Sequence, residues 1–411
     1  MKLRAAVVGC GSLANGGHLP ALQKSEVFDL VATCDRYADA AEAAAARWGA
    51  KRACTDWHDV TAAGDVDLIV LCTHTNLRGE LICEALRRGK PVYTEKPLAT
   101  SRAEMLEIFR AVRETGVPVC VGHNRRSSPA VLEFKRLMDL ARQNGADRAA
   151  IIDRNTGRRD RLDEENQTQL LLRVNDDIRT WKTWIFEDEQ GIILAEMVHF
   201  IDLALWLIPS APVEAFAIGS PRGNFTEIIR FRDGSAATLH QTMVGNFDYP
   251  KELFEATLRN VTIAMEHHVE VRQRGLESEP FRTCFPLKHG GELSGKQGIE
   301  AFHEAVDRLQ QMKRAACRGG RRTQRSQPSS SRESPAPLFI EPNKGHVRHL
   351  ESFGLHVLGK GENPCPVESA IVVTNIALKL LESVRLGLPV KIGPEDCNPI
   401  HSQRERGQGA G

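Results

Sequence analysis

Two residues of the sequence, Lys96 and His199, are candidates for a catalytic site. Their side chains can donate or accept a proton. Lys96 belongs to the segment Glu95-Lys96-Pro97, directly after a short apolar run. A lysine there can donate to a hydroxyl or carbonyl oxygen and share its proton during a reaction. His199 lies in the strongly apolar segment 192–208, and its imidazole can take up a hydroxyl proton or return it. Each also has a plainer interpretation, as a surface lysine and as a core histidine.

A second group of residues has the spacing of a dinucleotide-binding loop. Gly9-x-Gly11-x-x-Ala14 follows an apolar run and opens a helical pattern, and this context gives the motif its meaning. Gly9 permits a tight turn, Gly11 lets the backbone approach a pyrophosphate, and Ala14 allows the helix to pack closely on the sheet. Ser12 and Leu13 begin the helix, whose free N-terminal amides would face the phosphates.

The choice of dinucleotide depends on Asp35 and Arg36, at the end of the second apolar run. A carboxylate at Asp35 can accept both hydroxyls of an adenosine ribose and repels a 2′-phosphate, which favours NAD. A guanidinium at Arg36 can stack on adenine or bind a 2′-phosphate, so NADP stays open as an alternative.

The elements that must position these residues alternate between strands and helices over the first 120 residues. Strand candidates are 5–8, 30–34, 68–72, 92–94 and 119–121, and the helical patterns are 38–48, 77–88 and 102–115. Strands that are apolar throughout indicate a parallel sheet covered on both faces, so we expect a doubly wound α/β Rossmann domain over 1–124. Ligands of such sheets bind at the carboxyl edge, which is where Lys96 stands.

The pattern changes after residue 124. Helices are expected at 130–143, 192–208 and 367–386, and strands at 148–155, 214–218, 226–231, 236–242 and 253–257. Polar and apolar residues alternate better in these strands, and 232–235 has the composition of a hairpin turn. The sequence therefore predicts an α+β C-terminal domain with an open, mostly antiparallel sheet over 125–285 and 343–393.

The segment 286–342 differs from both predicted domains. It contains a helical stretch near 299–316, followed by residues in which Gly, Ser, Pro and Arg crowd out any core former. We interpret it as an insertion that ends in a flexible basic linker, although six basic residues between 313 and 325 could bind a partner. The tail 394–411 is expected to be disordered.

Composition limits the classes of partner. The 411 residues include 54 Lys and Arg against 53 Asp and Glu, which gives no electrostatic reason for binding nucleic acid or a membrane surface. The ten cysteines form no Cys-x-x-Cys pair, so we expect reduced thiols and no metal site. We find no signal-peptide pattern and no run near the roughly 20 apolar residues of a membrane helix, so we expect a cytoplasmic protein with a small substrate.

Four segments together resemble the glucose-fructose oxidoreductase, inositol dehydrogenase and MocA family (Gfo/Idh/MocA) in order and spacing. They are GCG at 9–11, EKPLA at 95–99, VGHNRR at 121–126 and EMVHFID at 196–202. The resemblance covers about residues 3–285 and 343–393, and Glu-Lys-Pro is its most specific element. It implies an NAD(P)-dependent oxidoreductase that transfers a hydride between the nicotinamide and a hydroxyl or keto carbon of a sugar, cyclitol or sugar derivative.

The resemblance also implies roles for individual residues. Family members place the Lys of Glu-Lys-Pro and a helical histidine beside the nicotinamide, which corresponds here to Lys96 and His199. Members of the inositol dehydrogenase type carry an Asp four residues before this histidine, where this chain has Ala195. That position is therefore vacant here, or its role has moved. Glu196 could orient His199 or hold a substrate hydroxyl, and it could equally form a structural salt bridge.

Further residues are candidates for binding the cofactor or the substrate. For the cofactor they are Thr73, Asn76, Glu95, Lys96 and Asn124, and for the substrate they are Lys96, Arg125, Asn175, Trp184 and His199. Arg125 could clamp a carboxylate or phosphate, although salt bridges would account for it too. Trp184 could stack on a sugar ring or pack in the core.

Two other functions stay open. A redox-neutral lyase or glycosidase of the same family would keep its NAD and release an aglycone without net NADH. A non-catalytic sensor would keep the dinucleotide site without turnover. In each case we expect a homo-oligomer, a dimer or tetramer, associated through the open sheet.

Overall fold

The structure is a computed structural model that describes residues 2–143, 150–152, 155–157, 159–161, 167–181, 191–220, 222–289, 293–320 and 340–398. Contacts divide the chain into two units, one of residues 1–128, 181–239 and 345–411 and the other of residues 129–180 and 240–344. The domain boundaries expected from the sequence differ from this grouping and remain predictions. Most of the expected basic linker, from residue 321 to 339, lies outside the described residues.

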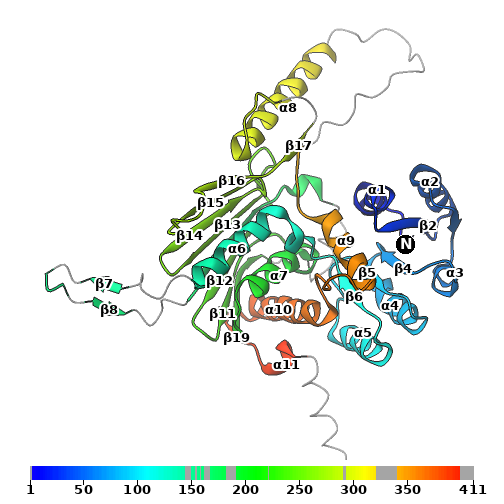
Figure 1. The fold of residues 1–411 in the computed structure, drawn as a ribbon, viewed down its shortest axis with the longest axis horizontal. Helices are drawn as coiled ribbons and strands as arrows, with labels where there is room; N and C mark the ends of the chain where they lie inside the picture. Colours follow the sequence, from blue (N-terminus) through cyan, green and yellow to red (C-terminus); the bar gives the residue numbers. More distant parts are fainter. Residues whose placement is uncertain are drawn as a thin grey trace, which may run out of the picture. The chain divides into compact units, whose positions relative to one another are not determined.

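The first unit contains the predicted doubly wound Rossmann sheet (Figure 1). Its strands are β1 (Leu3–Val8), β2 (Phe28–Cys34), β3 (Arg52–Cys54), β4 (Leu68–Leu71), β5 (Val92–Thr94) and β6 (Val119–Val121). They are parallel and follow the order β3-β2-β1-β4-β5-β6. The order of the strands along the sheet reverses between β1 and β4, and such folds bind ligands in the crevice at the carboxyl ends of the two strands that meet there.

Helices connect these strands and cover the sheet. They are η1 (Ala14–His18) running into α1 (Leu19–Lys24), α2 (Ala38–Trp48), α3 (Trp57–Ala62), α4 (Arg78–Arg87) and α5 (Arg102–Thr115). Local residues set their ends: the Ser101 hydroxyl accepts a hydrogen bond from Glu104 N at the start of α5, and left-handed Gly116 ends that helix. The element β3 and helix α3 are additions to the sequence prediction.

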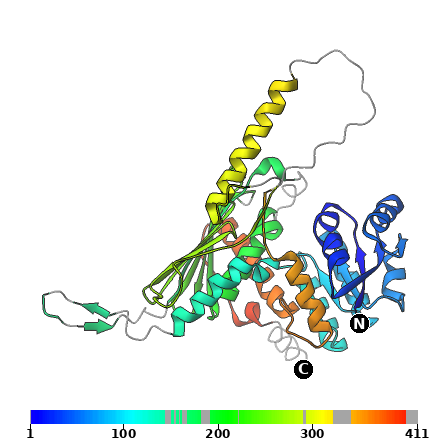
Figure 2. The same cartoon turned by 45° about the horizontal axis from the view of Figure 1, so that its top comes forward.

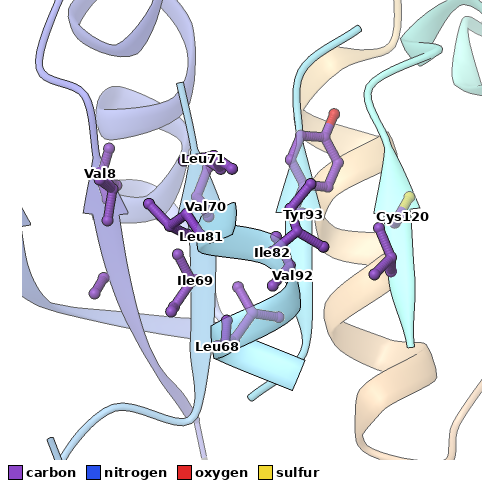
Figure 3. Packing of buried hydrophobic residues seen from close by; sticks show 14 of the residues in the cluster. Val8, Leu68, Ile69, Val70, Leu71, Leu81, Ile82, Val92, Tyr93 and Cys120 are labelled. Carbon is purple, nitrogen blue, oxygen red and sulfur yellow. The ribbon is translucent and has the colours of Figure 1, made fainter. Parts of the chain in front are cut away.

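The core of this domain is continuous through the sheet (Figure 3). Val8 of β1, the run Leu68–Leu71 of β4 and Tyr93 of β5 are at most 4% exposed. Because strands buried on both faces have no polar side, the apolar runs in the sequence identified them correctly.

The first unit also contains helices and antiparallel strands outside the Rossmann sheet. The helices are η3 (Asn124–Ser127), η7 (Ile193–Met197), α7 (Val198–Leu207), α9 (His346–Val357) and α10 (Val367–Leu386). The strands are β10 (Pro212–Ser220), β11 (Asn224–Phe231) and β19 (Val390–Lys391). The strand β10 pairs antiparallel with β11 and β19, and α10 packs on β10 and on α7. The next strand in the order after β11 is β12 (Ala236–Thr242).

A short helix, α11 (Pro394–Cys397), stands where the sequence predicted the start of a disordered tail. That expectation was wrong for these four residues because distant groups hold them. Asp396 Oδ1 accepts from Arg102 at 3.3 Å, and Asn375 Nδ2 donates to the Asp396 carbonyl at 3.0 Å. The rest of the predicted tail, 399–411, lies outside the described residues.

The second unit is an antiparallel sheet with a helix across one face (Figure 2). It contains α6 (Pro129–Gln143), β9 (Gln169–Asn175), η5 (Ile178–Thr180), β13 (Glu252–Leu258), β14 (Val261–Glu266), β15 (Glu270–Arg274) and β16 (Arg282–Cys284). The pairs β9–β13, β13–β14, β14–β15 and β15–β16 are all antiparallel, and α6 packs on β13, β14 and β15. These strands confirm the mostly antiparallel sheet expected after the Rossmann domain.

The second unit contains three further pieces, two of which lie in the predicted insertion 286–342. The hairpin β7 (Ala150–Ile152) and β8 (Arg159–Arg161) replaces the longer strand expected at 148–155. Strands β17 (Leu287–His289) and β18 (Ile340–Pro342) pair with each other, and α8 (Gly298–Gly320) contains the expected helix. No helix among the described residues is long and apolar enough to cross a membrane.

Candidate functional site

The glycine loop after β1 has the geometry that a dinucleotide requires. Gly9 adopts a φ of 93°, and a Cβ there would come within 2.8 to 2.9 Å of the Cys72 carbonyl group and the Thr73 nitrogen. A Cβ at Gly11 would meet no heavy atom within 4 Å, so the backbone there borders open space. Ser12 and Leu13 form the first helical residues before η1. The loop therefore combines one glycine that the fold requires with one that leaves room for a ligand.

Asp35 stands at the end of β2 and faces this loop. Its Oδ2 accepts a hydrogen bond from Cys10 N at 2.8 Å, and its Oδ1 accepts one from Tyr37 N at 3.1 Å. These amides fix the carboxylate beside the glycine loop, where an adenosine ribose would lie. The exposed Arg36 side chain lies over the Tyr37 ring, with 4.7 Å between its guanidinium carbon and the ring centroid.

Lys96 follows β5 at a cis peptide bond to Pro97. Its Nζ donates to the Ala195 carbonyl oxygen and lies 3.4 Å from Glu196 Oε2, and the side chain is 17% exposed. Burial lowers the pKa of Lys96, whereas the Glu196 and Glu95 carboxylates oppose that shift. An ammonium with a lowered pKa gives up and regains a proton more readily than a surface lysine.

The helical turn that faces Lys96 is wider than an α-helical turn. In η7 the Val198 N–H donates to the Ile193 carbonyl, five residues back, and regular α-helix resumes at α7. Turns of this kind often occur at functional sites. Here the turn presents the Ala195 carbonyl and the Glu196 carboxylate to Lys96.

Two arginines of η3 form ion pairs with acidic residues of η7 and α7. Arg125 Nη2 donates to Glu196 Oε1 at 3.1 Å, and its guanidinium carbon lies 4.8 Å from the Phe200 ring centroid. Arg126 donates to both oxygens of Asp202, at 2.8 and 2.5 Å. The salt-bridge interpretation that the sequence left open for Arg125 and Glu196 is therefore what the geometry shows.

His199 is 5% exposed and lies one residue into α7. The His199 and His123 rings are nearly perpendicular, with 5.7 Å between the centroids and an interplanar angle of 88°. Burial lowers the pKa of His123 to about 4, so that imidazole is neutral near pH 7. His199 therefore has an uncharged aromatic neighbour on that side.

One group among the described residues has the ligand atoms for a metal, namely His123, Asp202 and Cys365. Both oxygens of Asp202 are bound by the Arg126 guanidinium, and a cation placed there would be repelled by that charge. We therefore assign no metal to this group.

The Glu95 carboxylate points into the protein. Its Oε1 lies 2.7 Å from His18 Nε2, and the residue is 5% exposed. Burial alone would raise the pKa of Glu95, but His18, Lys96 and Arg78 bring it down to about 2. Arg78 also donates to the Glu95 and Pro97 carbonyls, at 2.7 and 2.8 Å. His18 and Arg78 were absent from the sequence prediction because local patterns do not show which distant residues they meet.

The remaining candidates for binding the cofactor or the substrate are spread over several elements. Thr73 follows β4, and its buried Oγ1 has no hydrogen-bond partner among the described residues. Asn76 lies in η2 (Thr75–Leu77), and Asn124 is buried at the start of η3. Asn175 ends β9 in the second unit and donates to the Asn246 carbonyl at 2.9 Å. Trp184 lies outside the described residues.

These residues fit a nicotinamide dinucleotide. The open space at Gly11 can admit a pyrophosphate, and the unsatisfied Thr73 hydroxyl can bind a ribose or phosphate oxygen. Asp35 would hold the adenosine ribose, and Lys96 would lie at the same edge of the sheet.

Comparisons with known proteins agree with this geometry. The model of the oxidoreductase family with an NAD-binding Rossmann fold (GFO_IDH_MocA) matches residues 3–123. The chain is 35% identical over 128 residues to 4-carboxy-2-hydroxymuconate-6-semialdehyde dehydrogenase of Sphingobium sp., a match that spans 31% of this chain and 40% of that relative. It is 29% identical over 309 residues to inositol 2-dehydrogenase 2 of Saccharopolyspora erythraea, covering 71% of this chain and 84% of that protein.

A solved structure shows the same fold. It is an oxidoreductase from Agrobacterium radiobacter in complex with NAD+, L-tartaric acid and magnesium, with a TM-score of 0.69 at 16% identity. The superposition covers 95% of this chain and 98% of that one. The two-part architecture is therefore shared along nearly the whole chain.

Proposed function

Because the chain belongs to the Gfo/Idh/MocA family of oxidoreductases, with an NAD-binding Rossmann fold, we propose that it is an NAD-dependent dehydrogenase acting on a CH–OH group. The substrate we propose is a sugar, a cyclitol or a derivative of one. The observation that carries this proposal is the contact of Lys96 with the Ala195 carbonyl and the Glu196 carboxylate, one turn before His199.

The residues divide the reaction between them. When bound, the nicotinamide supplies the hydride chemistry that no side chain can perform. Lys96 donates a hydrogen bond to the substrate oxygen and stabilises the charge that develops on it. His199 takes the hydroxyl proton during oxidation and returns it during reduction. Glu196 holds Lys96 in place and balances its charge together with that of Arg125.

The cofactor we propose is NAD. The Asp35 carboxylate is fixed by two backbone amides beside the glycine loop, and it would repel a 2′-phosphate at that place. Arg36, whose guanidinium lies over the Tyr37 ring, would then stand beside the adenine.

Outward-facing apolar residues suggest self-association. Ile218 of β10 and Ile228 of β11 are 55% and 39% exposed, and apolar surface of this kind is commonly buried against a partner. We therefore propose that the protein forms a homo-oligomer, a dimer or tetramer. A measurement of its molar mass in solution tests this.

The formation of NADH tests the proposed activity. Purified protein is mixed with NAD and, one at a time, with inositols, aldoses, amino sugars and uronates, and the absorbance of NADH is followed. We expect NADH with one of these substrate classes. NAD retained through purification, with an aglycone released and no net NADH, would point to the redox-neutral lyase or glycosidase. NAD binding without turnover of any compound would point to the sensor.

A further inference from the structure

His18 and Glu95 meet in the interior of the Rossmann domain from elements far apart in the sequence. His18 is the last residue of η1, the helix that follows the glycine loop, and Glu95 follows β5. Their side chains approach to 2.7 Å, with only 2% and 5% of the two residues exposed. The His18 ring also meets the Tyr93 ring edge to face, at 5.4 Å between centroids. A buried carboxylate requires such a partner to remain charged.

The surroundings leave the Glu95 carboxylate little freedom to move. A Cβ at Gly122 would lie 3.1 to 3.2 Å from the carboxylate atoms, so the backbone after β6 already closes one side. Arg78 binds the Glu95 and Pro97 carbonyls on either side of Lys96. The backbone of Lys96 is therefore held between anchored neighbours.

Charged and titratable groups surround both Glu95 and Lys96. Around Glu95 they are His18 from η1, Arg78 from α4, the neighbouring Lys96, and the titratable Cys72, Tyr93 and His123. Around Lys96 they are Glu196, Glu95, Arg125 and His123. Of these four groups, only the Glu196 and Glu95 carboxylates favour the charged form of Lys96. The Glu95 carboxylate has its hydrogen bond with His18.

We infer that His18 is a positioning residue for Lys96 and acts through the Glu95 carboxylate. One buried hydrogen bond thereby connects the helix of the cofactor loop to the lysine. This inference rests on the proposed function for its importance in catalysis, but the connection itself can be measured without substrate or cofactor.

The expected direction follows from the charges. Without a hydrogen bond from residue 18, the buried Glu95 carboxylate loses its partner, and burial favours either its protonated form or a turn of the charged group away from the interior. In both cases the negative charge near Lys96 weakens, and its ammonium gives up its proton at a lower pH.

The test measures the titration of Lys96 in the intact protein. The protein is labelled with trace acetic anhydride at a series of pH values, and mass spectrometry of the peptide that contains Lys96 gives the midpoint of its labelling. In His18→Ala we expect the midpoint to fall by about one pH unit, since a single opposite charge nearby contributes at least that much. Glu95→Gln, which keeps the shape of the side chain, should show the same fall.

Two further variants separate positioning from packing. His18→Gln keeps a nitrogen donor near the position of Nε2, so its midpoint should return toward that of the wild type. The double variant His18→Ala, Glu95→Gln should shift no further than either single variant. His58→Ala serves as the control, because it breaks a solvent-exposed contact with Glu84, at 3.0 Å, in the same domain.

An unchanged midpoint in His18→Ala or in Glu95→Gln would overturn the inference, as would additive shifts or a His18→Gln midpoint equal to that of His18→Ala. If His18→Ala does not fold, Glu95→Gln and His18→Gln decide the question alone. If the labelling midpoints shift as expected but no substrate yields NADH, the proposed function is rejected. The connection from His18 through Glu95 to Lys96 then still holds.

Discussion

The Glu196 carboxylate lies 3.4 Å from the Lys96 ammonium, although the two residues are 100 positions apart. The same turn of helix directs the Ala195 carbonyl to the lysine. At Ala195 the sequence lacks the Asp of inositol dehydrogenase-type members, and the next residue supplies a carboxylate that reaches Lys96. We propose that Glu196 replaces that Asp as the carboxylate beside Lys96. The wide turn of η7 presents Glu196 to the lysine.

Lys96→Met should abolish most turnover while leaving the cofactor site intact. The variant removes the ammonium that would contact the substrate oxygen, and losses of about 100-fold to 10,000-fold in kcat are typical of such groups. NAD binding, followed by fluorescence, should stay within about twofold of the wild type, because Gly9, Gly11 and Asp35 are unchanged. Lys51→Met, at an exposed position, serves as the control. A Lys96→Met protein with wild-type kcat would remove Lys96 from the mechanism.

Glu196→Gln should shift the pH dependence of turnover. Burial lowers the pKa of Lys96 and Glu196 opposes that shift, so removing the charge lets the pKa fall further. The ammonium is then lost at a lower pH, and the alkaline limb of the kcat profile should move down by about one unit. Glu84→Gln, in α4, should leave the limb in place. An alkaline limb that stays at the wild-type pH in Glu196→Gln would show that Glu196 does not act on Lys96.

Asp35→Ser should weaken the preference for NAD over NADP. The substitution removes the negative charge that would repel a 2′-phosphate and leaves Arg36 nearby to bind it. We expect the ratio of kcat/KM values for the two cofactors to change by roughly 10-fold to 100-fold, which corresponds to about 1.4 to 2.7 kcal/mol. Asp39→Ser, in the first turn of α2, is the matched control. If NADP is already the better cofactor of the wild-type protein, the role given to Asp35 is wrong.

Gly9→Ala should destabilise the protein and impair NAD binding together. The new Cβ would come 2.8 Å from the Cys72 carbonyl carbon, and the φ of 93° is strained for any residue with a side chain. A loss of about 1 to 3 kcal/mol in the free energy of unfolding is expected, measured by urea denaturation. Gly16→Ala, where a Cβ would meet no heavy atom within 4 Å, should be nearly neutral. Equal stabilities of the two variants would contradict this reading of the loop.

Glu227 should make the stability of the fold depend on pH. This residue of β11 is fully buried, neither carboxylate oxygen has a hydrogen-bond partner among the described residues, and burial raises its pKa to about 8. The unfolded chain ionises near pH 4.3 while the folded protein stays protonated, so stability should fall from about pH 4 to about pH 8. Below that window both states are protonated and the penalty is absent.

Glu227→Met removes this titration and should flatten the decline. The melting temperature of the variant should exceed that of the wild type by more at pH 8 than at pH 5. Glu255→Met, at an exposed position of β13, should change the pH dependence little. A parallel shift of Glu227→Met at both pH values would show that the carboxyl is not titrating on unfolding.

The sequence predicted the Rossmann half well because its strands are buried on both faces. Runs such as Leu68–Leu71 need no alternation to be recognised, and Gly9 stands directly after one of them. The strands β14 and β15 were missed. Their turns use Arg259-Asn260 and His267-His268, all with positive φ, so the glycine that usually marks a hairpin is absent there.

Part of the site could not be predicted from local pattern. The resemblance to a family indicated Lys96 and His199, but no periodicity connects Lys96 with Glu196 or His18 with Glu95, which lie 100 and 77 positions apart. Such pairs form only when the sheet brings its carboxyl ends together. The helix α11 was missed for the same reason, since Arg102 and Asn375 hold it from far away in the sequence.

The transfer of deuterium from the substrate tests whether a hydride passes directly to the nicotinamide. The substrate that yields NADH is prepared with deuterium on its carbinol carbon, and the reduced cofactor is analysed by mass spectrometry after one turnover. Direct hydride transfer beside Lys96 and His199 predicts a reduced cofactor one mass unit heavier, with the label at C4 of the nicotinamide. Reduced cofactor without the label, or label that stays in the sugar or passes to water, would rule out direct hydride transfer to the nicotinamide.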